Sequence, residues 1–541
     1  MQTTREKNEN AKPLTEISPS RPMQRWWPWI FAVFSGILQV LIFPLPNWTF
    51  LCWVAIAPLL VALLRAGAAA NGYAVVAIRS GFLIGWISGI FFYAGSCYWV
   101  YHVMVLYGGL AGPVGAGVLL LFCLYVGLVH GLFGALVAFL ASRKNWGSRA
   151  LVAAPFLWVA TELFRARVIG FPWDVLGTVL VDNLPLSRIA TMTGVYGLSF
   201  EILLVNTALV AILIGRRERR ILMLAAWILL VGMMETGSLL DGPRVTASGT
   251  ARLVQQNIPL GIDWNAPLYE QTLRDLADIS VPKPGEGMPG DPLPDLVIWP
   301  ESPAPFFSND SRYRATLSNI AQKANAYVLA GSLGTVHGSE NTQQVFNSAE
   351  LVAPSGEWIA RYDKIHLVPF GEYVPFKDLF SFANKLTKEV GDFVPGTERL
   401  VLPVHTFKLG TFICYESIFP DEVRMFAKQG AGLLVNISND GWFGDTGAPI
   451  QHLRMARMRA IENNRWVVRS TNTGVSVSID PLGRVVQQAR RNVRVAIDVP
   501  YGIVSSTTFY TRHGDWFAWA CAIISLAALF LRPPFRTGTA P

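Results

Sequence analysis

The sequence predicts a polytopic α-helical membrane domain joined to a globular α/β domain. The chain of 541 residues is 52% hydrophobic and only 15% charged, whereas a soluble protein carries about 25% charged residues. Its charges are also unevenly distributed. Residues 243–512 hold 26 basic and 26 acidic side chains, so the rest of the chain carries the whole net charge of +8. A basic surplus beside apolar segments is typical of the cytoplasmic flanks of membrane helices.

Eight apolar segments are candidates for the membrane helices, since a helix needs about 20 apolar residues to cross the hydrocarbon core of a bilayer. They cover roughly residues 26–45, 48–64, 80–101, 113–141, 150–164, 189–214, 221–240 and 515–531. The predicted organisation is a basic tail (1–25), a seven-helix membrane domain (26–240), a globular domain (241–512), a final transmembrane helix (513–532) and a short tail (533–541).

The charges of the connecting loops predict the orientation in the membrane. The N-terminal tail has five basic residues and the segment "GRRERR" at 215–220 has four, whereas the loops at 46–48 and 102–112 have none. Basic loops favour the cytoplasm. An even number of spans then places both termini in the cytoplasm and the 241–512 domain outside it.

Three glutamates lie in or near the predicted spans. A charged side chain at the bilayer centre costs roughly 2.5–3.5 kcal/mol on insertion scales, so each of them could line a polar cavity. Placement at a helix end is the simpler interpretation for two of the three, Glu162 and Glu235; the third is Glu201.

Residues 250–500 alternate between short β-like apolar runs and helical patterns, which indicates an α/β domain. About 250 residues are enough to bury one sizeable core. The β-like runs include "DLVIWPE", "AYVLAGS", "LGTFICYE" and "GLLVNISND".

Three chemically reactive side chains stand at or near the ends of such runs, where the reacting groups of α/β proteins gather. They are Glu301 in "WPES", Lys364 in "DKIHLVPFGEYVPF" and Cys414 in "ICYESIFP". A thiol must lose its proton to attack, a carboxylate can take that proton, and an ammonium can stabilise the resulting oxyanion. Taken singly, each has a structural interpretation: a buried cysteine usually acts as a small hydrophobe. The shared setting of proline, glycine and aromatic residues favours the catalytic one.

Other kinds of site find no support in the sequence. The globular domain has no basic excess with which to bind nucleic acid. No H-E-x-x-H, C-x-x-C, P-loop, G-x-G-x-x-G or G-x-S-x-G motif is present, so we expect no metal, nucleotide cofactor or serine nucleophile. The histidines His366, His405 and His452 lack metal-ligand spacing and are interpreted as structural.

Several longer motifs resemble the apolipoprotein N-acyltransferases, membrane members of the nitrilase (carbon–nitrogen hydrolase) superfamily. The motifs are "ICYESIFPDEVR" (413–424), "NDGWFGD" (439–445), "QHLRMARMRAIENNR" (451–465) and "RSTNTGVS" (469–476). The resemblance covers nearly the whole chain. It implies an αββα sandwich for residues 241–512, on the periplasmic side of a bacterial inner membrane.

The resemblance also implies an activity and a set of site residues. A phospholipid would donate an acyl chain to the cysteine as a thioester, and the α-amino group of the diacylglyceryl-cysteine of an apolipoprotein would accept it. The resemblance implies no cofactor. The family's triad falls on Glu301, Lys364 and Cys414, its supporting residues on Glu372, Tyr415 and Glu416, and a mobile tryptophan near the site entrance on Trp264.

Two other functions stay open at this level. One is a membrane-tethered amidase that hydrolyses a small substrate, although such an enzyme needs at most one anchor. The other is a transporter with a solute-binding outer domain, but paired repeats and broken helices are not evident. Within residues 375–396, Phe382 and Leu386 belong to an apolar stripe of helical period. We interpret this stripe as an arm that dips into the membrane interface beside the site, the alternative being an ordinary helix of the core.

Overall fold

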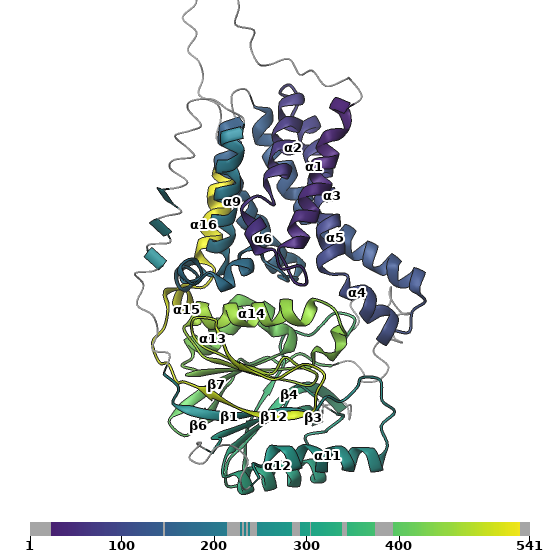
Figure 1. Ribbon diagram of the computed structural model, residues 1–541, viewed down its shortest axis with the longest axis vertical. Helices are drawn as coiled ribbons and strands as arrows, with labels where there is room; N and C mark the ends of the chain where they lie inside the picture. The colour runs from purple at the N-terminus through teal and green to yellow at the C-terminus, as the bar shows by residue number, and fades with distance from the viewer. Residues whose placement is uncertain are drawn as a thin grey trace, which may run out of the picture.

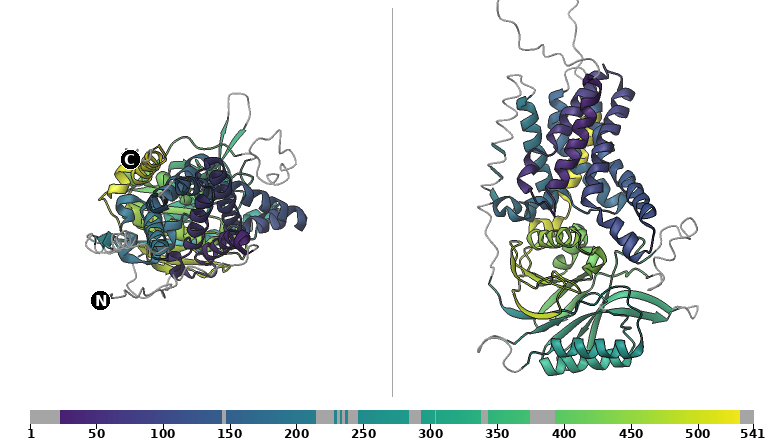
Figure 2. Two further views of the ribbon diagram at one scale, coloured as in Figure 1. Left: turned by 90° about the horizontal axis from the view of Figure 1, so that it is seen from above. Right: turned by 45° about the vertical axis from the view of Figure 1, so that its right-hand side comes forward.

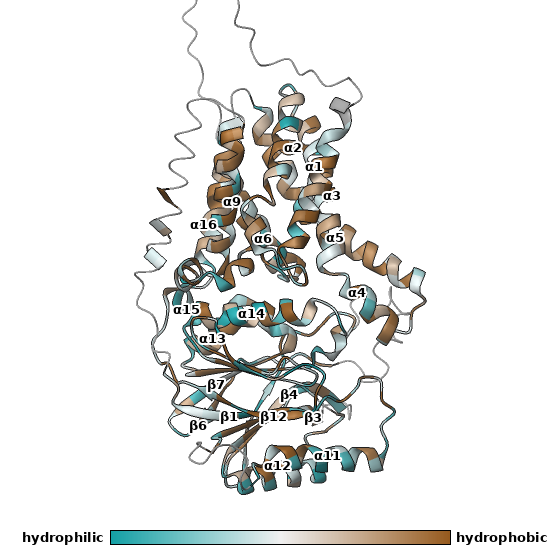
Figure 3. Ribbon diagram, in the orientation of Figure 1, coloured by the Kyte–Doolittle hydropathy of each residue, from teal (hydrophilic) through white to brown (hydrophobic). Residues whose placement is uncertain are grey.

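A helical bundle and an α/β sandwich are stacked along the long axis of the molecule in a computed structural model (Figure 1). The structure describes residues 23–143, 147–213, 246–283, 293–302, 304–337, 343–373 and 393–530, and three short pieces between 228 and 237. Hydrophobic residues dominate the bundle, whereas the outermost helices of the sandwich carry many hydrophilic ones (Figure 3).

The bundle is built by the first part of the chain and closed by its last helix. Its main helices are α1 (Met23–Leu41), α2 (Ala57–Ala69), α3 (Ala74–Ser96), α5 (Gly112–Ser142), α6 (Gly147–Phe164), α9 (Val195–Leu213) and α16 (Trp516–Phe530). Short helical segments connect them: η1 (Thr49–Trp53), α4 (Trp99–His102), η2 (Val103–Tyr107), η3 (Arg165–Ile169), η4 (Leu176–Asp182), α7 (Leu184–Ser187) and α8 (Ala190–Thr193).

Helices α3 and α5 pack closely because small residues line their contact. A Cβ atom at Gly85 would lie 2.2 Å from the carbonyl oxygen of His130, and one at Gly81 would lie 2.4 Å from that of Gly134. Since lipid gives membrane helices little hydrophobic reason to associate, close backbone approach of this kind is a main source of their packing energy.

Four of the described helical segments are long and apolar enough to cross a membrane: Thr49–Ala69, Ala74–Ser96, Gly112–Ser142 and Val195–Leu213. Trp26–Leu41 and Trp516–Phe530 are apolar but shorter. The predicted span 221–240 lies almost wholly outside the described residues, as do most of the two predicted tails. The count of eight spans therefore stays a prediction.

The predicted span 80–101 has the wrong limits, since α3 begins and ends earlier. The chain leaves the helix at Cys97, and the following segment turns toward the sandwich. The hydroxyl of Tyr98 accepts a hydrogen bond from the Gly447 amide (3.0 Å), and that of Tyr107 donates to the Gly441 carbonyl (2.9 Å). Hydropathy alone does not reveal this turn because the connecting residues are themselves largely apolar and aromatic.

The sandwich consists of two six-stranded sheets. The first has the order β12-β1-β2-β3-β4-β5 and the second the order β11-β10-β9-β8-β7-β6. The strands of the first sheet are β1 (Gly249–Gln255), β2 (Leu296–Ile298), β3 (Tyr327–His337), β4 (Gln343–Val352), β5 (Trp358–Asp363) and β12 (Val495–Tyr501). Those of the second are β6 (Val401–Val404), β7 (Phe407–Ile413), β8 (Leu433–Ser438), β9 (Val467–Thr471), β10 (Val477–Ile479) and β11 (Val485–Gln488).

Helices cover the outer face of each sheet, so the layers are αββα, as the resemblance implied. α11 (Ala266–Ser280) and α12 (Ser311–Ala324) cover the first sheet at the end far from the bundle. α13 (Pro420–Lys428) and α14 (Ala448–Asn463) cover the second sheet, and α14 lies between it and the bundle (Figure 2). The short α15 (Phe509–His513) leads from the sandwich back to α16.

Hydrogen bonds fix the sandwich to the bundle. The side-chain amide of Gln451 on α14 donates to the carbonyls of Pro44 (3.3 Å) and Ser96 (3.0 Å), and its Oε1 accepts from the indole N–H of Trp173 (2.9 Å). The Glu462 carboxylate accepts from the amide of Val195 at the start of α9 (2.9 Å). These hydrogen bonds between buried polar groups hold the two parts in one relative position.

The parallel strands bring the predicted site residues together. β1, β2 and β3 pair in parallel in one sheet, as do β7, β8 and β9 in the other. Reacting groups collect at the carboxyl ends of such strands, and Glu301 follows β2 there while Cys414 follows β7 directly.

Candidate active site

A buried ammonium group lies at the centre of the site. Lys364 follows β5, its side chain is 1% exposed, and its Nζ donates to Glu301 Oε1 (3.0 Å) and Glu372 Oε1 (2.9 Å). Burial alone would lower the pKa of Lys364, but the two facing carboxylates outweigh it and hold the pKa well above its ordinary value. The ammonium is therefore charged at any physiological pH.

Asn347 also bonds to both carboxylates. It lies buried within β4, and its Nδ2 donates to Glu301 Oε1 (2.8 Å) and to Glu372 Oε1 (2.6 Å). Glu372 Oε2 in turn accepts from the Val368 amide (2.8 Å), which fixes the loop after β5. Sequence reasoning missed Asn347, because a single asparagine in "VFNSAELV" carries no signal that distinguishes it from other strand residues.

Glu301 keeps one oxygen oriented by the opposite sheet. Its Oε2 accepts the amide N–H of Asn439 (2.8 Å), the residue that follows β8. A carboxylate oxygen has two lone-pair sites, so Oε2 has capacity left to accept a proton from a nearby group.

Cys414 occupies a strained turn between β7 and the 3₁₀ helix η6 (Cys414–Ile418). Its φ angle is +48°, a left-handed conformation that costs a non-glycine residue about 1–3 kcal/mol. Burial raises the pKa of the thiol, and the charge of Glu301 raises it further, while Lys364 only partly offsets them. The resting group is therefore a neutral thiol, which needs a base before it can attack.

Glu416 supports the site from behind instead of facing it. Its Oε2 accepts from the Ile413 amide (2.7 Å), and its Oε1 accepts from the Ile365 amide (2.7 Å) and the Tyr362 hydroxyl (2.8 Å). One carboxylate thus ties the backbone beside Cys414 to the backbone beside Lys364. Burial raises its pKa although these donors oppose the shift.

A cavity of about 530 Å³ lies beside these residues, between the sandwich and the bundle. Tyr415, the residue after the cysteine, lines it and donates its hydroxyl hydrogen to the Gly170 carbonyl of the bundle (3.2 Å). Apolar and aromatic side chains form much of the wall, and Arg167, His366, Asp421, Glu422 and Asp515 form a polar edge. The charges of this edge are paired: Arg167 with both aspartates (2.9 and 2.6 Å), and Glu422 with Arg399 (2.5 Å).

Of the three residues predicted at the site entrance, the structure describes only Trp264. Trp264 is half-buried and packs against the core beneath α11 and α12, not against the cavity. Phe382 and Leu386 lie outside the described residues, so the interfacial arm stays a prediction. Tyr373 and Phe393, which flank the undescribed stretch, both line the cavity.

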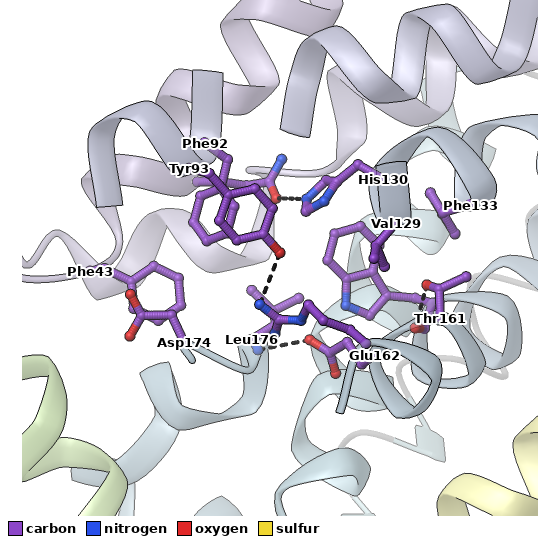
Figure 4. Close-up of a pocket in the computed structure, with 13 residues that line it drawn as sticks. Phe43, Phe92, Tyr93, Val129, His130, Phe133, Thr161, Glu162, Asp174 and Leu176 are labelled. Carbon is purple, nitrogen blue, oxygen red and sulfur yellow. Dashed lines mark hydrogen bonds between the residues drawn. The ribbon is translucent and has the colours of Figure 1, made fainter. Parts of the chain in front are cut away.

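A second, much smaller cavity lies within the bundle (Figure 4). Its volume of about 20 Å³ is enough for a water molecule. Glu162, close to the end of α6, lines it and accepts from the Leu176 amide (2.9 Å), so the end-of-helix and the cavity interpretations both hold for this residue. Its other polar lining residues are Gln39, Tyr93, His130, Thr161, Arg165 and Asp174. Glu201 is fully buried in α9, and Glu235 lies outside the described residues.

No cluster of three or more metal-ligating side chains occurs among the residues that the structure describes. Tyr415 and Ile365, the residues after Cys414 and Lys364, line the larger cavity, and behind them the structure holds a buried thiol, a carboxylate with a free lone pair and a permanently charged ammonium. This set suits acyl transfer through a thioester, because each of the groups needed for proton removal and oxyanion stabilisation is present.

Comparison with known proteins gives matches in both parts of the chain. The family described as the apolipoprotein N-acyltransferase N-terminal domain matches residues 35–208, and the carbon–nitrogen hydrolase family matches residues 293–499.

Relatives of known identity match along most of the chain. The apolipoprotein N-acyltransferase of Geobacter metallireducens is 37% identical over 518 residues, which cover 94% of this chain and 95% of the relative. That of Bradyrhizobium diazoefficiens is 32% identical over 408 residues, or 73% and 75% of the two chains. Among solved structures, Saccharomyces cerevisiae Nit3, a member of branch 10 of the nitrilase superfamily, is 19% identical over 48% of this chain and 93% of its own, with a TM-score of 0.36.

Proposed function

The chain belongs to the apolipoprotein N-acyltransferases, and on that premise we propose that Cys414, Glu301 and Lys364 form the triad through which it transfers the acyl group. The protein is an acyltransferase of lipoprotein maturation, with membrane helices and a nitrilase-like domain. The observation that carries the proposed triad is the buried Lys364 ammonium, bonded to Glu301 at 3.0 Å next to the turn that presents Cys414.

In the first half-reaction the acyl group moves from a phospholipid to the enzyme. Cys414 Sγ attacks the carbonyl carbon of a fatty-acyl ester while Glu301 takes the thiol proton. The tetrahedral oxyanion forms beside the Lys364 ammonium, which is charged throughout. The ester C–O bond then breaks, Glu301 returns the proton to the departing lysophospholipid oxygen, and a thioester remains on Cys414.

In the second half-reaction the α-amino group of a diacylglyceryl-cysteine accepts the acyl chain. The amine nitrogen attacks the thioester carbon and loses a proton to Glu301, and the oxyanion again faces Lys364. The C–S bond breaks, an amide forms, and Glu301 returns the proton to the Cys414 sulfur. The same three groups serve both steps, since each step passes through the same kind of intermediate.

Glu372 and Asn347 act as positioning residues in this scheme. Glu372 supplies a second negative charge, which keeps Lys364 protonated when Glu301 is transiently neutral. Asn347 holds both carboxylates through one Nδ2 atom, so neither rotates toward the thiol or away from the lysine.

The sandwich faces the periplasm in our proposal, and both lipid substrates reach the cavity from the outer leaflet of the inner membrane. The distribution of basic residues supports this orientation. α1 ends beside the sandwich, where Pro44 contacts Gln451, so α2 leads away from it. Exposed Arg65 near the end of α2 and Arg79 near the start of α3 then belong to the opposite, cytoplasmic end.

A reconstituted transfer assay tests the proposed triad. Purified enzyme in detergent would receive a phospholipid with an isotope-labelled acyl chain and a diacylglyceryl-cysteine peptide, and the peptide mass would be followed. We expect the peptide to gain one labelled acyl group with wild type and none with Cys414→Ala. Cys521→Ala, which alters a buried cysteine of α16, is the matched control and should transfer normally. Transfer by Cys414→Ala at a substantial rate would contradict the proposal.

A further inference from the structure

A charged cluster lies buried next to the backbone of Cys414 and takes no part in the scheme above. It consists of Asp440 at the start of η7 (Asp440–Phe443), His452 on α14 and Arg469 on β9, and the side chains of all three are 0% exposed. Arg469 Nη2 donates to Asp440 Oδ2 (2.6 Å), and His452 Nδ1 lies 2.9 Å from Asp440 Oδ1. The hydroxyl of Ser438 also donates to Asp440 (2.8 Å), so both carboxylate oxygens have partners.

The other imidazole nitrogen of His452 reaches the nucleophile itself. Nε2 lies 3.0 Å from the backbone carbonyl oxygen of Cys414. A carbonyl oxygen can only accept, so Nε2 must carry a hydrogen and donate it. Nε2 carries this hydrogen in both protonation states of the ring. In the neutral imidazole Nδ1 can accept from Arg469 Nη2 at 3.0 Å, and in the charged one Nδ1 can donate to Asp440.

The carbonyl that receives this bond belongs to the residue with the left-handed backbone conformation. A cysteine at a φ of +48° persists only where its surroundings over-determine it. On the N-terminal side, the Ile413 amide is fixed by Glu416 Oε2 at 2.7 Å. His452 binds the carbonyl of Cys414 itself on the C-terminal side, so the two side chains hold the backbone at one residue before Cys414 and directly after it.

The imidazole has little freedom to leave this position, because aromatic rings enclose it. The indole of Trp173 stacks on it with ring centroids 5.7 Å apart and an angle of 23° between the planes, and Phe443 packs edge-on at 5.9 Å. Trp173 belongs to the bundle, where its carbonyl accepts from Arg165 (2.7 Å). The membrane part of the chain thus helps to orient the histidine.

We propose that His452 is a positioning residue for the acyl transfer, which holds the strained backbone of Cys414 through its Nε2–H so that the sulfur faces the acyl carbon. The inference rests on the proposed role of Cys414 as nucleophile. The sequence analysis interprets His452 as structural, and the contact with the Cys414 carbonyl adds this positioning role to that interpretation.

Two substitutions of similar size distinguish this role from space filling. A glutamine amide nitrogen can reach the place of Nε2, whereas an asparagine amide reaches only the place of Nδ1. His452→Asn should lower kcat for transfer by roughly 10- to 100-fold with KM little changed, the range expected when a buried acceptor loses its donor. His452→Gln should recover most of this loss. His405→Asn, in the turn between β6 and β7, is the matched control and should behave as wild type.

Equal rates for His452→Gln and His452→Asn, whether both normal or both low, would overturn the proposal. So would a change confined to KM. Thermal unfolding of each variant shows whether it folds. If neither variant folds, the hydrogen on Nε2 can be tested in the wild-type enzyme by NMR. In ¹⁵N-histidine-labelled protein, the His452 Nε2 resonance should be that of a protonated nitrogen, and a deprotonated Nε2 would refute the bond. Full transfer by Cys414→Ala would instead refute the triad itself, so the two failures are distinguishable.

Discussion

Replacing Lys364 by alanine and by arginine separates the charge of this side chain from its shape. Alanine removes the cation and leaves Glu301 and Glu372 buried beside each other. Removing one partner of a buried ion pair costs about 3–5 kcal/mol of folding stability, and losing one oxyanion donor lowers kcat by about 10²–10³. We therefore expect Lys364→Ala to be both less stable and less active than the wild type.

Arginine keeps the charge but not the geometry. The lysine side chain is only 1% exposed, and inserting extra atoms into such a packed site costs about 1–3 kcal/mol. A planar guanidinium also cannot present a compact point charge to a tetrahedral oxygen. Lys364→Arg should thus be more stable than Lys364→Ala yet lose a similar factor of about 10²–10³ in kcat.

The pH dependence gives a further check of the charge. The pKa of Lys364 is raised in the folded protein, where the carboxylates outweigh burial. A raised pKa contributes stability that is fully present below the unfolded value of about 10.4 and is lost as pH rises through the folded value. The stability that the ion pairs of Lys364 contribute should therefore stay constant from about pH 6 to pH 9.

For the two Lys364 variants, activity is measured as transfer from a fluorescent-acyl phospholipid, and stability as thermal unfolding followed by tryptophan fluorescence. Wild-type rates for Lys364→Arg would refute the reasoning, because diffuse positive charge would then suffice.

Three further predictions concern the carboxylate pair, the kinetic mechanism and the packing of the bundle. Asn347→Leu removes the donor to both carboxylates and should lower kcat by about tenfold or more, and Asn347→Asp should be worse because it adds a third negative charge; equal, near-normal rates would show that Asn347 only fills space. Initial-rate lines for donor and acceptor should be parallel, since one site serves both substrates in turn, and intersecting lines would argue against a free acyl-enzyme. Gly85→Val should lower the thermal midpoint of unfolding because its Cβ would lie 2.2 Å from the His130 carbonyl; Gly117→Val, with nothing within 4 Å, is the control, and equal midpoints would contradict the close α3–α5 packing.

The sequence was informative where a reactive residue follows an apolar strand. Glu301 and Cys414 could be singled out because each follows an apolar strand, β2 and β7, and the structure places both strands in parallel ladders. Asn347 could not be found in this way, since it lies in the middle of β4 and acts through neighbours 46 and 25 residues away. The role of His452 depends on a contact with the Cys414 carbonyl 38 residues away, for which no local pattern exists. Likewise, hydropathy did not place the end of α3, because the turn that follows is also apolar.

The central claim is that Cys414 carries the acyl group between the two substrates, and the mass of the enzyme itself tests it most directly. Wild-type protein incubated with phospholipid alone should gain the mass of one acyl chain, the adduct should map to Cys414, and neutral hydroxylamine should release it. Adding the diacylglyceryl-cysteine peptide should return the enzyme to its original mass while the peptide gains the same chain. An enzyme that transfers acyl groups to the peptide but never carries an adduct, or carries one that the peptide does not remove, would contradict the account.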